Sequence, residues 1–264
     1  MKIGVHMRSL LFSTVIALSL CVLAAYGQKA RSAAPTGGQR KAIENIVRDY
    51  LLTHPEVVRD AMQALQAKEE ADKLKAASAN IASHRADLYS DADSPAAGNA
   101  NADVTVVVFF DYFCGYCRKS LPSLPAVLAN DLSVRIVFKE FPILGDQSTI
   151  AAKAALAAGR QGKYLEFHQA MLEADGAGDV AIKAVAERLG LDYPKLQKDM
   201  LDPKIAAAID RNIRLADSLK IEGTPAYLIG DEVVPGAIPA ERLAGKIAAQ
   251  RQKLAKEKTT ALNQ

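Results

Sequence analysis

The fold is decided by one stretch of the chain, residues 104–117, which has the sequence VTVVVFFDYFCGYC. Its first seven residues, Val104–Phe110, form a nearly continuous apolar run rich in β-branched side chains, which predicts a strand buried on both faces. Cys114 and Cys117 follow this run, and residues 118–130 then show a helical pattern interrupted by prolines. The stretch therefore predicts a strand, a Cys-x-x-Cys pair and a kinked helix in direct succession.

The segments downstream complete an α/β pattern. Residues 134–141 predict a second strand, and a strand–helix–strand unit favours a parallel pair. Residues 147–220 have a helical pattern throughout. A third strand is predicted at 226–229, a fourth begins at 233–234, and 239–256 predict a closing helix. We therefore expect a small sheet that is interrupted by a helical block of about 70 residues.

Residues 1–27 have the features of a secretory signal peptide. A short basic start precedes an apolar run, Leu10–Ala25, and Ala25-Tyr26-Gly27 fits a small-x-small cleavage pattern. The run is shorter than the roughly 20 residues that span a membrane. An uncleaved anchor is therefore the second interpretation, and a lipoprotein at Cys21 is the least favoured. We expect export to the periplasm, which leaves Cys114 and Cys117 as the cysteines of the mature chain.

Residues 28–92 predict an N-terminal helical segment. Its first helix carries one apolar stripe, formed by Ile43, Ile46, Val47, Tyr50 and Leu51.

A capping box is expected at the start of the second helix, with Thr53 as the N-cap and Glu56 as its partner. Residues 89–103 are mostly turn formers and predict the boundary to the next domain.

The two helices of residues 40–88 have few large apolar side chains, so they cannot easily bury their stripes alone. A weak heptad seam runs through Ala67, Leu74, Ile81 and Leu88. Either these helices pack on the main domain, or they associate with other copies of the chain. We expect a homo-oligomer, and the seam is too weak to separate a dimer from a trimer.

The composition narrows the classes of function. The chain has 264 residues, of which 50% are hydrophobic and 24% charged, and this excludes a largely disordered protein. Lys and Arg total 33 against 30 Asp and Glu, and so small an excess argues against a dedicated nucleic-acid binder. With three cysteines, a disulfide-dense scaffold is also excluded.

The pair Cys114 and Cys117 favours redox chemistry over the alternatives. A helix N-terminus stabilises a thiolate, so we expect Cys114 to be the exposed attacking sulfur and Cys117 to lie one turn further in. Two intervening residues allow the sulfurs to cycle between dithiol and disulfide. Zinc needs four ligands, and the histidines of the mature chain are scattered, so no metal site is expected. Weak copper(I) binding by the two thiolates is kept as a secondary property.

A second motif, the pair Thr224-Pro225, lies immediately before the predicted third strand. A Thr-Pro pair in isolation indicates only a turn. After a Cys-x-x-Cys motif it gains weight, because a cis proline would turn the Thr224 backbone toward the cysteines. The strand-like N–H and C=O groups of this backbone would then meet an extended substrate chain.

Three separate motifs, in this order, resemble the DsbA-like thiol-disulfide oxidoreductases, which have a thioredoxin fold with an inserted helical domain. They are FFDYFCGYCRKSLP at 109–122, FKEFPILG at 138–145 and EGTPA at 222–226. The N-terminal IENIVRDYL at 43–51, with HPEV at 54–57, resembles the ScsC-type subgroup, which is linked to suppression of copper sensitivity. Members of that subgroup oligomerise through this segment and can act as disulfide isomerases.

The resemblance implies a thioredoxin-like domain over 93–258, with a helical insertion at about 146–219 and a tail at 259–264. It implies that Cys114 is the nucleophile and Cys117 the resolving cysteine. Gly115, Tyr116, Thr224 and Pro225 would contact the substrate.

Two departures from the family pattern bear on the chemistry. Many relatives carry a carboxylate six residues before the first cysteine, where this chain has Val108. Glu140 on the neighbouring strand is a candidate for the missing proton transfer, although it could equally be a solvated strand end. The strongly oxidising relatives also have a His between the cysteines, and Tyr116 cannot carry its charge. We therefore expect a less acidic Cys114 and a less oxidising disulfide.

These features favour an exported disulfide isomerase or reductase. A dithiol oxidase that introduces disulfides into newly exported chains would use the same residues in the opposite resting state. A third hypothesis is a copper(I)-binding or chaperone-like protein without turnover. The partners expected are exported client proteins with cysteines and a membrane redox partner.

Overall fold

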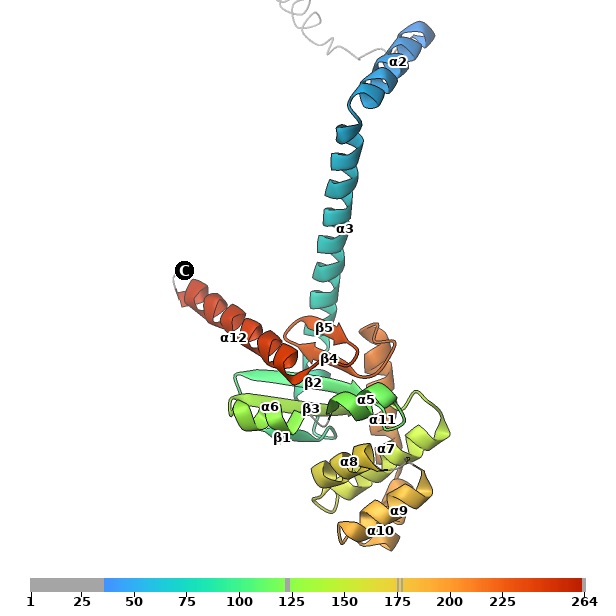
Figure 1. Ribbon diagram of the computed structural model, residues 1–264, viewed down its shortest axis with the longest axis vertical. Helices are drawn as coiled ribbons and strands as arrows, with labels where there is room; N and C mark the ends of the chain where they lie inside the picture. The colour runs from blue at the N-terminus through green and yellow to red at the C-terminus, as the bar shows by residue number, and fades with distance from the viewer. Residues whose placement is uncertain (1–35, 122–123, 175, 177, 263–264) are drawn as a thin grey trace, which may run out of the picture. The chain divides into compact units, whose positions relative to one another are not determined.

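The computed structural model describes residues 36–121, 124–174, 176 and 178–262 (Figure 1). The predicted signal peptide, residues 1–27, lies outside these residues. The contacts divide the chain into two units, 1–68 and 69–264, which are described separately below. In the described part, no helix combines the length and apolar character that crossing a bilayer requires.

The first unit contains α2 (Gly37–Thr53) and the first part of α3 (Pro55–Ser83). A capping box formed by Thr36 and Gln39 begins α2. The capping box predicted for the second helix is wrong, because the Thr53 hydroxyl donates to the carbonyl oxygens of Asp49 and Tyr50 in the preceding helix. Thr53 thus satisfies the last turn of α2 and leaves the start of α3 uncapped by its side chain.

The second unit has a five-stranded sheet in the order β1-β3-β2-β4-β5. Its strands are β1 (Ala96–Gly98), β2 (Val104–Phe110), β3 (Val134–Glu140), β4 (Ala226–Ile229) and β5 (Glu232–Pro235). The pair β2 and β3 is parallel, as predicted, and the other neighbouring pairs are antiparallel. The strand β1 lies within residues 89–103, the turn-rich segment that was predicted to be a domain boundary. Its three residues are too few to show a strand pattern.

Helices connect and cover these strands. The active-site segment forms α5 (Gly115–Ser120) and α6 (Leu124–Asn130) in place of one kinked helix. The predicted helical block between β3 and β4 is present. Figure 1 shows α7–α10 gathered beyond one end of the sheet, and α11 running back toward β4. The block consists of α7 (Asp146–Gly159), α8 (Tyr164–Glu173), α9 (Asp179–Arg188), α10 (Tyr193–Met200) and α11 (Pro203–Ser218), and α12 (Ala240–Leu262) follows β5. This is a thioredoxin fold with an inserted helical domain.

The core has one layer on each face of the sheet. Alternate residues of β2 point to opposite faces, because side chains alternate along a strand. Val108 and Phe110 pack with the cysteines and the helical block, whereas Val107 and Phe109 pack with the second layer. The seam residues Ile81 and Leu88 belong to that second layer and are buried, the latter in α4 (Arg85–Tyr89). The C-terminal part of the N-terminal segment therefore packs on the main domain, which was one of the two interpretations.

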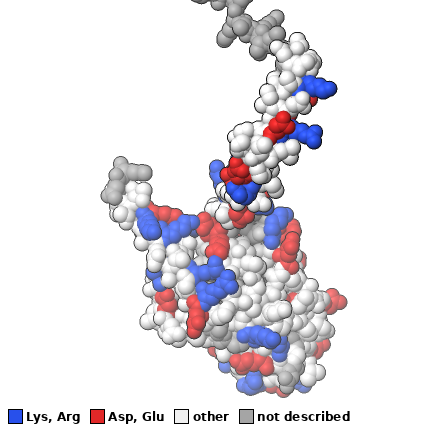
Figure 2. Space-filling view, turned by 45° about the horizontal axis from the view of Figure 1, so that its top comes forward, with Lys and Arg blue, Asp and Glu red and all other residues white. Residues whose placement is uncertain are grey.

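The charged surface has no single sign. Figure 2 shows Lys and Arg interspersed with Asp and Glu. Several of these charges form ion pairs, such as Arg251 of α12 with Asp103 and Asp131 near the ends of β2 and β3. Exposed pairs of this kind contribute little each to the free energy of unfolding.

Candidate active site

The two cysteines lie where β2 gives way to α5, and they differ in accessibility. Cys114 is the N-cap of α5 and is 8% exposed, whereas Cys117, inside the first turn, is fully buried. Both are free thiols. Cys114 is therefore the less buried of the two sulfurs.

The Thr224 backbone lies against the first cysteine. The Cys114 Sγ donates a hydrogen bond to the carbonyl oxygen of Thr224 over 3.1 Å. The Thr224–Pro225 peptide bond is cis, and Pro225 is followed directly by β4, which pairs with β2. The structure thus brings together three of the residues singled out in the sequence, although 110 positions separate the two partners of this contact.

The environment shifts the pKa values of the two thiols in opposite directions. Burial raises the pKa of Cys114, but hydrogen bonds from the Thr224 side chain and from the backbone N–H groups of Cys117 and Tyr116 outweigh it, so the pKa is lowered overall. Burial dominates at Cys117 and raises its pKa strongly. Cys114 therefore ionises more easily than an ordinary cysteine, and Cys117 less easily.

The residues between the cysteines provide an uncharged surface. Tyr116 is 68% exposed, and Gly115 has open space where a side chain would stand. Phe113, just before the first cysteine, is 38% exposed. The surface beside Cys114 is thus partly apolar and adds no positive charge that would lower the pKa of Cys114 further.

Glu140 is not a solvated strand end, because it is only 1% exposed. Its Oε1 accepts hydrogen bonds from the Tyr112 hydroxyl (3.2 Å) and the Tyr164 hydroxyl (2.8 Å). The Tyr112 hydroxyl also lies 3.0 Å from Nδ1 of His168. Burial raises the pKa of Glu140 well above its usual value and lowers the pKa of His168 to about 3. Burial therefore favours the neutral form of both groups, and the proton-transfer role of Glu140 stays a prediction.

Sequence reasoning missed Asp111, the residue that fixes the segment before the cysteines. Its buried carboxylate accepts hydrogen bonds from the N–H groups of Phe113, Ile143 and Leu144 and from the hydroxyl of Ser148. These donors come from the active-site segment, the segment after β3 and the first turn of α7. The signal in the sequence was an acid placed directly between a buried strand and a cysteine motif.

Arg118 ties α5 to the helical insertion. Its guanidinium donates to the carbonyl oxygens of Tyr112, Met171, Ala174 and Gly176. Three of these oxygens belong to the end of α8 and the residues after it, where a helix leaves carbonyl groups without partners. The helix that carries the cysteines is thus attached to both parts of the domain.

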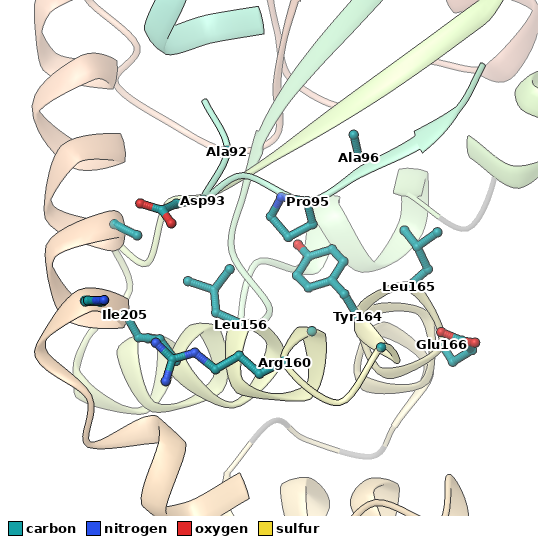
Figure 3. Close-up of a pocket in the computed structure, with 14 residues that line it drawn as sticks. Ala92, Asp93, Pro95, Ala96, Leu156, Arg160, Tyr164, Leu165, Glu166 and Ile205 are labelled. Carbon is teal, nitrogen blue, oxygen red and sulfur yellow. The ribbon is translucent and has the colours of Figure 1, made fainter. Parts of the chain in front are cut away.

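A pocket of about 580 Å³ lies away from the cysteines, between the residues that lead into β1 and the helices α7, α8 and α11 (Figure 3). Tyr164 and Arg160 line it. Arg160 forms an ion pair with Asp202, and the Tyr164 hydroxyl is occupied by Glu140. Neither cysteine lines this hollow.

Two models of known protein families match parts of this chain. Residues 105–248 match the DSBA-like thioredoxin domain. This chain belongs to the DsbA-like family. Residues 39–72 also match the N-terminal domain of the copper resistance protein ScsC, so this DsbA-like chain is of the ScsC type.

Solved structures of other DsbA-like proteins agree with this assignment. A thioredoxin-like oxidoreductase from Silicibacter pomeroyi DSS-3 is 40% identical and has a TM-score of 0.62, covering 64% of this chain and 98% of its own. Proteus mirabilis ScsC in a transitional conformation is 30% identical with a TM-score of 0.62, covering 83% of this chain and 100% of its own. The second alignment extends over more of this chain than the first.

Curated relatives include much longer proteins. The Na⁺/H⁺ antiporter NhaA 1 of Salinispora arenicola (strain CNS-205) is 30% identical over 153 residues, which are 57% of this chain. The match spans only 24% of the length of that antiporter. The similarity therefore concerns a part of that protein.

Proposed function

We propose that this protein is an exported thiol–disulfide oxidoreductase that acts on protein disulfides, with Cys114 as nucleophile and Cys117 as resolving cysteine. The observation that carries the proposal is the contrast between the two thiols. Cys114 keeps a small exposed fraction of 8% and has a lowered pKa, whereas Cys117 is fully buried and has a raised one. The thiolate is the nucleophile, so this asymmetry supports a first attack by Cys114.

The reaction begins on a disulfide of a client protein. The Cys114 thiolate attacks one client sulfur, a Cys114–client bond forms, and the released client sulfur takes up a proton. In the reductase route, Cys117 then attacks Cys114 and frees the second client thiol. In the isomerase route, another client thiol attacks the client sulfur instead, leaving a rearranged client disulfide and a reduced Cys114.

Isomerase or reductase action is favoured over oxidase action by the uncharged residues between the cysteines. A positive charge beside Cys114 would stabilise its thiolate, and a dithiol stabilised in this way makes its disulfide a stronger oxidant. Gly115 and the exposed Tyr116 supply no such charge. The reduced form is therefore less favoured than it would be beside a histidine, and the alternative of a dithiol oxidase is the weaker one.

Substrate chains would be held next to the nucleophile by the Thr224–Pro225 segment, with Gly115 and Tyr116 on the other side. The Thr224 carbonyl already accepts a hydrogen bond from Cys114. Once Cys114 is joined to a client, this carbonyl is released and becomes available to a backbone N–H of the client chain, as in strand pairing.

The homo-oligomer proposed for residues 40–88 is supported by the exposed stripe of α2. Its apolar residues are between 36% and 67% exposed, and they are Ile43, Ile46, Val47, Tyr50 and Leu51. Val47→Glu is expected to lower the mass measured by light scattering. Asn45→Glu adds the same charge outside the stripe and serves as the control. An unchanged mass for the Val47 variant would contradict this oligomer.

Copper(I) binding is proposed only as a secondary property of the two thiols. Thiolates are suitable soft ligands for this ion. In the described part of the chain, no group of three or more His, Cys, Asp and Glu side chains is placed to hold a metal. Copper retained against a modest chelator, and lost in Cys114→Ser, is the expected result if the property is real.

The function is tested with scrambled-disulfide ribonuclease and the mature protein kept reduced. Recovery of ribonuclease activity is expected, and Cys114→Ala should abolish it. No recovery, together with rapid oxidation of reduced ribonuclease by the disulfide form, would establish the oxidase alternative. Periplasmic location and a membrane redox partner are parts of the same proposal, and fractionation of cells tests the first of them.

A further inference from the structure

None of the residues discussed so far explains how the resolving cysteine, Cys117, loses its proton. Cys117 is fully buried, and burial raises its pKa strongly. It must nevertheless lose its proton when it attacks Cys114. The next largest influences on this thiol are the Asp111 backbone, Cys114 and Thr224, and no carboxylate side chain is among them. Glu140 is directed instead to Tyr112 and Tyr164.

A hydroxyl group stands on the sheet beside the uncharged Val108. Val108 of β2 pairs directly with Tyr227 of β4 in the antiparallel register. Directly paired residues place their side chains on the same face of a sheet. Both residues belong to the same buried cluster as Cys117, and Tyr227 is only 1% exposed.

The Tyr227 hydroxyl is held in place by the helix that carries the cysteine. It donates a hydrogen bond to the Ser120 Oγ over 3.3 Å. Ser120 lies three residues after Cys117, so the two share one face of α5. The Ser120 hydroxyl in turn donates to the Tyr116 carbonyl oxygen over 2.9 Å. This chain of hydroxyl groups therefore runs along the buried face of α5 on which Cys117 lies.

The electrostatics agree with this placement. Burial raises the pKa of Tyr227, and negative charge on Cys117 raises it further. The hydroxyl is thus within electrostatic reach of the sulfur and keeps its proton when Cys117 ionises. A hydroxyl that stays protonated is a hydrogen-bond donor, and the Tyr227 hydroxyl donates to Ser120, on the face of α5 that carries Cys117.

We propose that Tyr227, anchored by Ser120, is the positioning residue that favours ionisation of Cys117 in the resolution step. This inference rests on the proposed redox function of the two cysteines. As the Cys117 proton leaves, the Ser120 hydroxyl turns from the Tyr116 carbonyl oxygen toward the sulfur, while the Tyr227 hydroxyl continues to donate to Ser120, so the negative charge on sulfur gains a hydrogen-bond donor. The thiolate then attacks the Cys114 Sγ, the Cys114–client bond breaks, and its electron pair leaves on the client sulfur, which takes up a proton.

The test measures two steps separately, using oxidised glutathione as the probe. Reduced protein first forms a Cys114–glutathione mixed disulfide with release of one glutathione, and Cys117 then displaces the second. The chain has no tryptophan, so the species are followed by acid quenching and mass spectrometry. The first step is isolated in the Cys117→Ser background, and the second is measured with Cys117 intact across pH 6–9.

Tyr227→Phe removes only the hydroxyl. It is expected to slow the second step by about fivefold, the equivalent of one ordinary hydrogen bond, and to move its pH profile upward. The first step should be unchanged. Ser120→Ala should produce a smaller change in the same direction.

Tyr89→Phe is the matched control, because its hydroxyl donates to the Gly230 carbonyl just after β4 and has no part in the site. If Tyr89→Phe and Tyr227→Phe slow the second step equally, the inference is overturned. It is also overturned if the pH profile of the second step does not move in Tyr227→Phe. Failure of the unmodified protein to form or resolve the mixed disulfide would instead overturn the proposed function.

Discussion

The Cys114 Sγ and the Thr224 carbonyl oxygen lie 3.1 Å apart, across the junction between the start of α5 and the start of β4. Thr224 acts on the sulfur through its side chain as well, because the hydroxyl hydrogen bond lowers the pKa of Cys114. A single residue thus contacts the nucleophile through its backbone and sets its acidity through its side chain.

Thr224→Val is expected to raise the pKa of Cys114 by removing this hydroxyl and keeping the shape of the side chain. The loss of one hydrogen bond to the thiolate should reduce the thiolate fraction at pH 7 by about fivefold. Ultraviolet absorbance of the thiolate as a function of pH measures it. Thr105→Val, in β2, is the control and should leave the titration unchanged. An unaltered titration in Thr224→Val would contradict the assignment.

Asp111→Asn should destabilise the domain far more than an ordinary polar substitution. The carboxylate accepts hydrogen bonds from three backbone N–H groups and one hydroxyl, and an amide presents a donor group to some of them. Leaving buried donors without acceptors costs about 1–3 kcal/mol each. Urea unfolding of Asp111→Asn and of Ser148→Ala, which loses one of the four bonds, should therefore differ by more than about 1 kcal/mol. Equal losses would show that the other three bonds contribute nothing.

The Glu140 and His168 pair predicts opposite pH dependences of stability. The folded-state pKa of His168 is lowered to about 3, so its unfolded form binds a proton first and stability falls as pH drops below about 6.5. The folded-state pKa of Glu140 is raised, so stability is lost as pH rises above about 4.5.

Glu140→Gln therefore should gain stability relative to the unmodified protein as pH rises from 4.5 to 7. Its difference in unfolding free energy should change by at most about 1.4 kcal/mol per pH unit. Thermal unfolding at several pH values measures this slope. A difference that does not vary with pH would mean that Glu140 is ionised in the folded protein.

Asp91 should contribute more to the free energy of unfolding than its near neighbour Asp93. The fully buried Lys139 ammonium donates to Asp91, to Ser94 and to the Asp87 carbonyl oxygen. Asp91→Asn leaves a buried charge without its counter-ion and should cost about 3 kcal/mol. Asp93 pairs with Arg211 at the exposed surface, so Asp93→Asn should cost less than about 1 kcal/mol. Comparable losses in the two variants would contradict this account.

Local sequence patterns predicted the helices and strands that have a strong hydrophobic periodicity or clear residues at their ends. The apolar run before Cys114 marks β2, which has the predicted bounds, Val104–Phe110. The Cys-x-x-Cys and Thr-Pro motifs were likewise visible. Their contact was anticipated because a cis proline at Pro225 would turn the Thr224 backbone toward the cysteines, and the structure has both the cis bond and the contact.

The rest depended on pairing between distant segments. Tyr227 gains its significance from lying opposite Val108, and a register between strands separated by more than a hundred residues is not written in either strand. Glu140 was open to opposite interpretations, because its burial is determined by Tyr112 and Tyr164 from other elements. Thr53 shows the same limit at short range, since a hydroxyl between two helices can serve either of them.

The two edges of the sheet also restrict how the protein meets unfolded chains. The edge strand β1 has three residues and is preceded by Pro95, while β5 has four and ends at Pro235. Short edges interrupted by proline are poor templates for further strand pairing. Under the proposed function, these edges would therefore offer a bound client chain little backbone for further strand pairing.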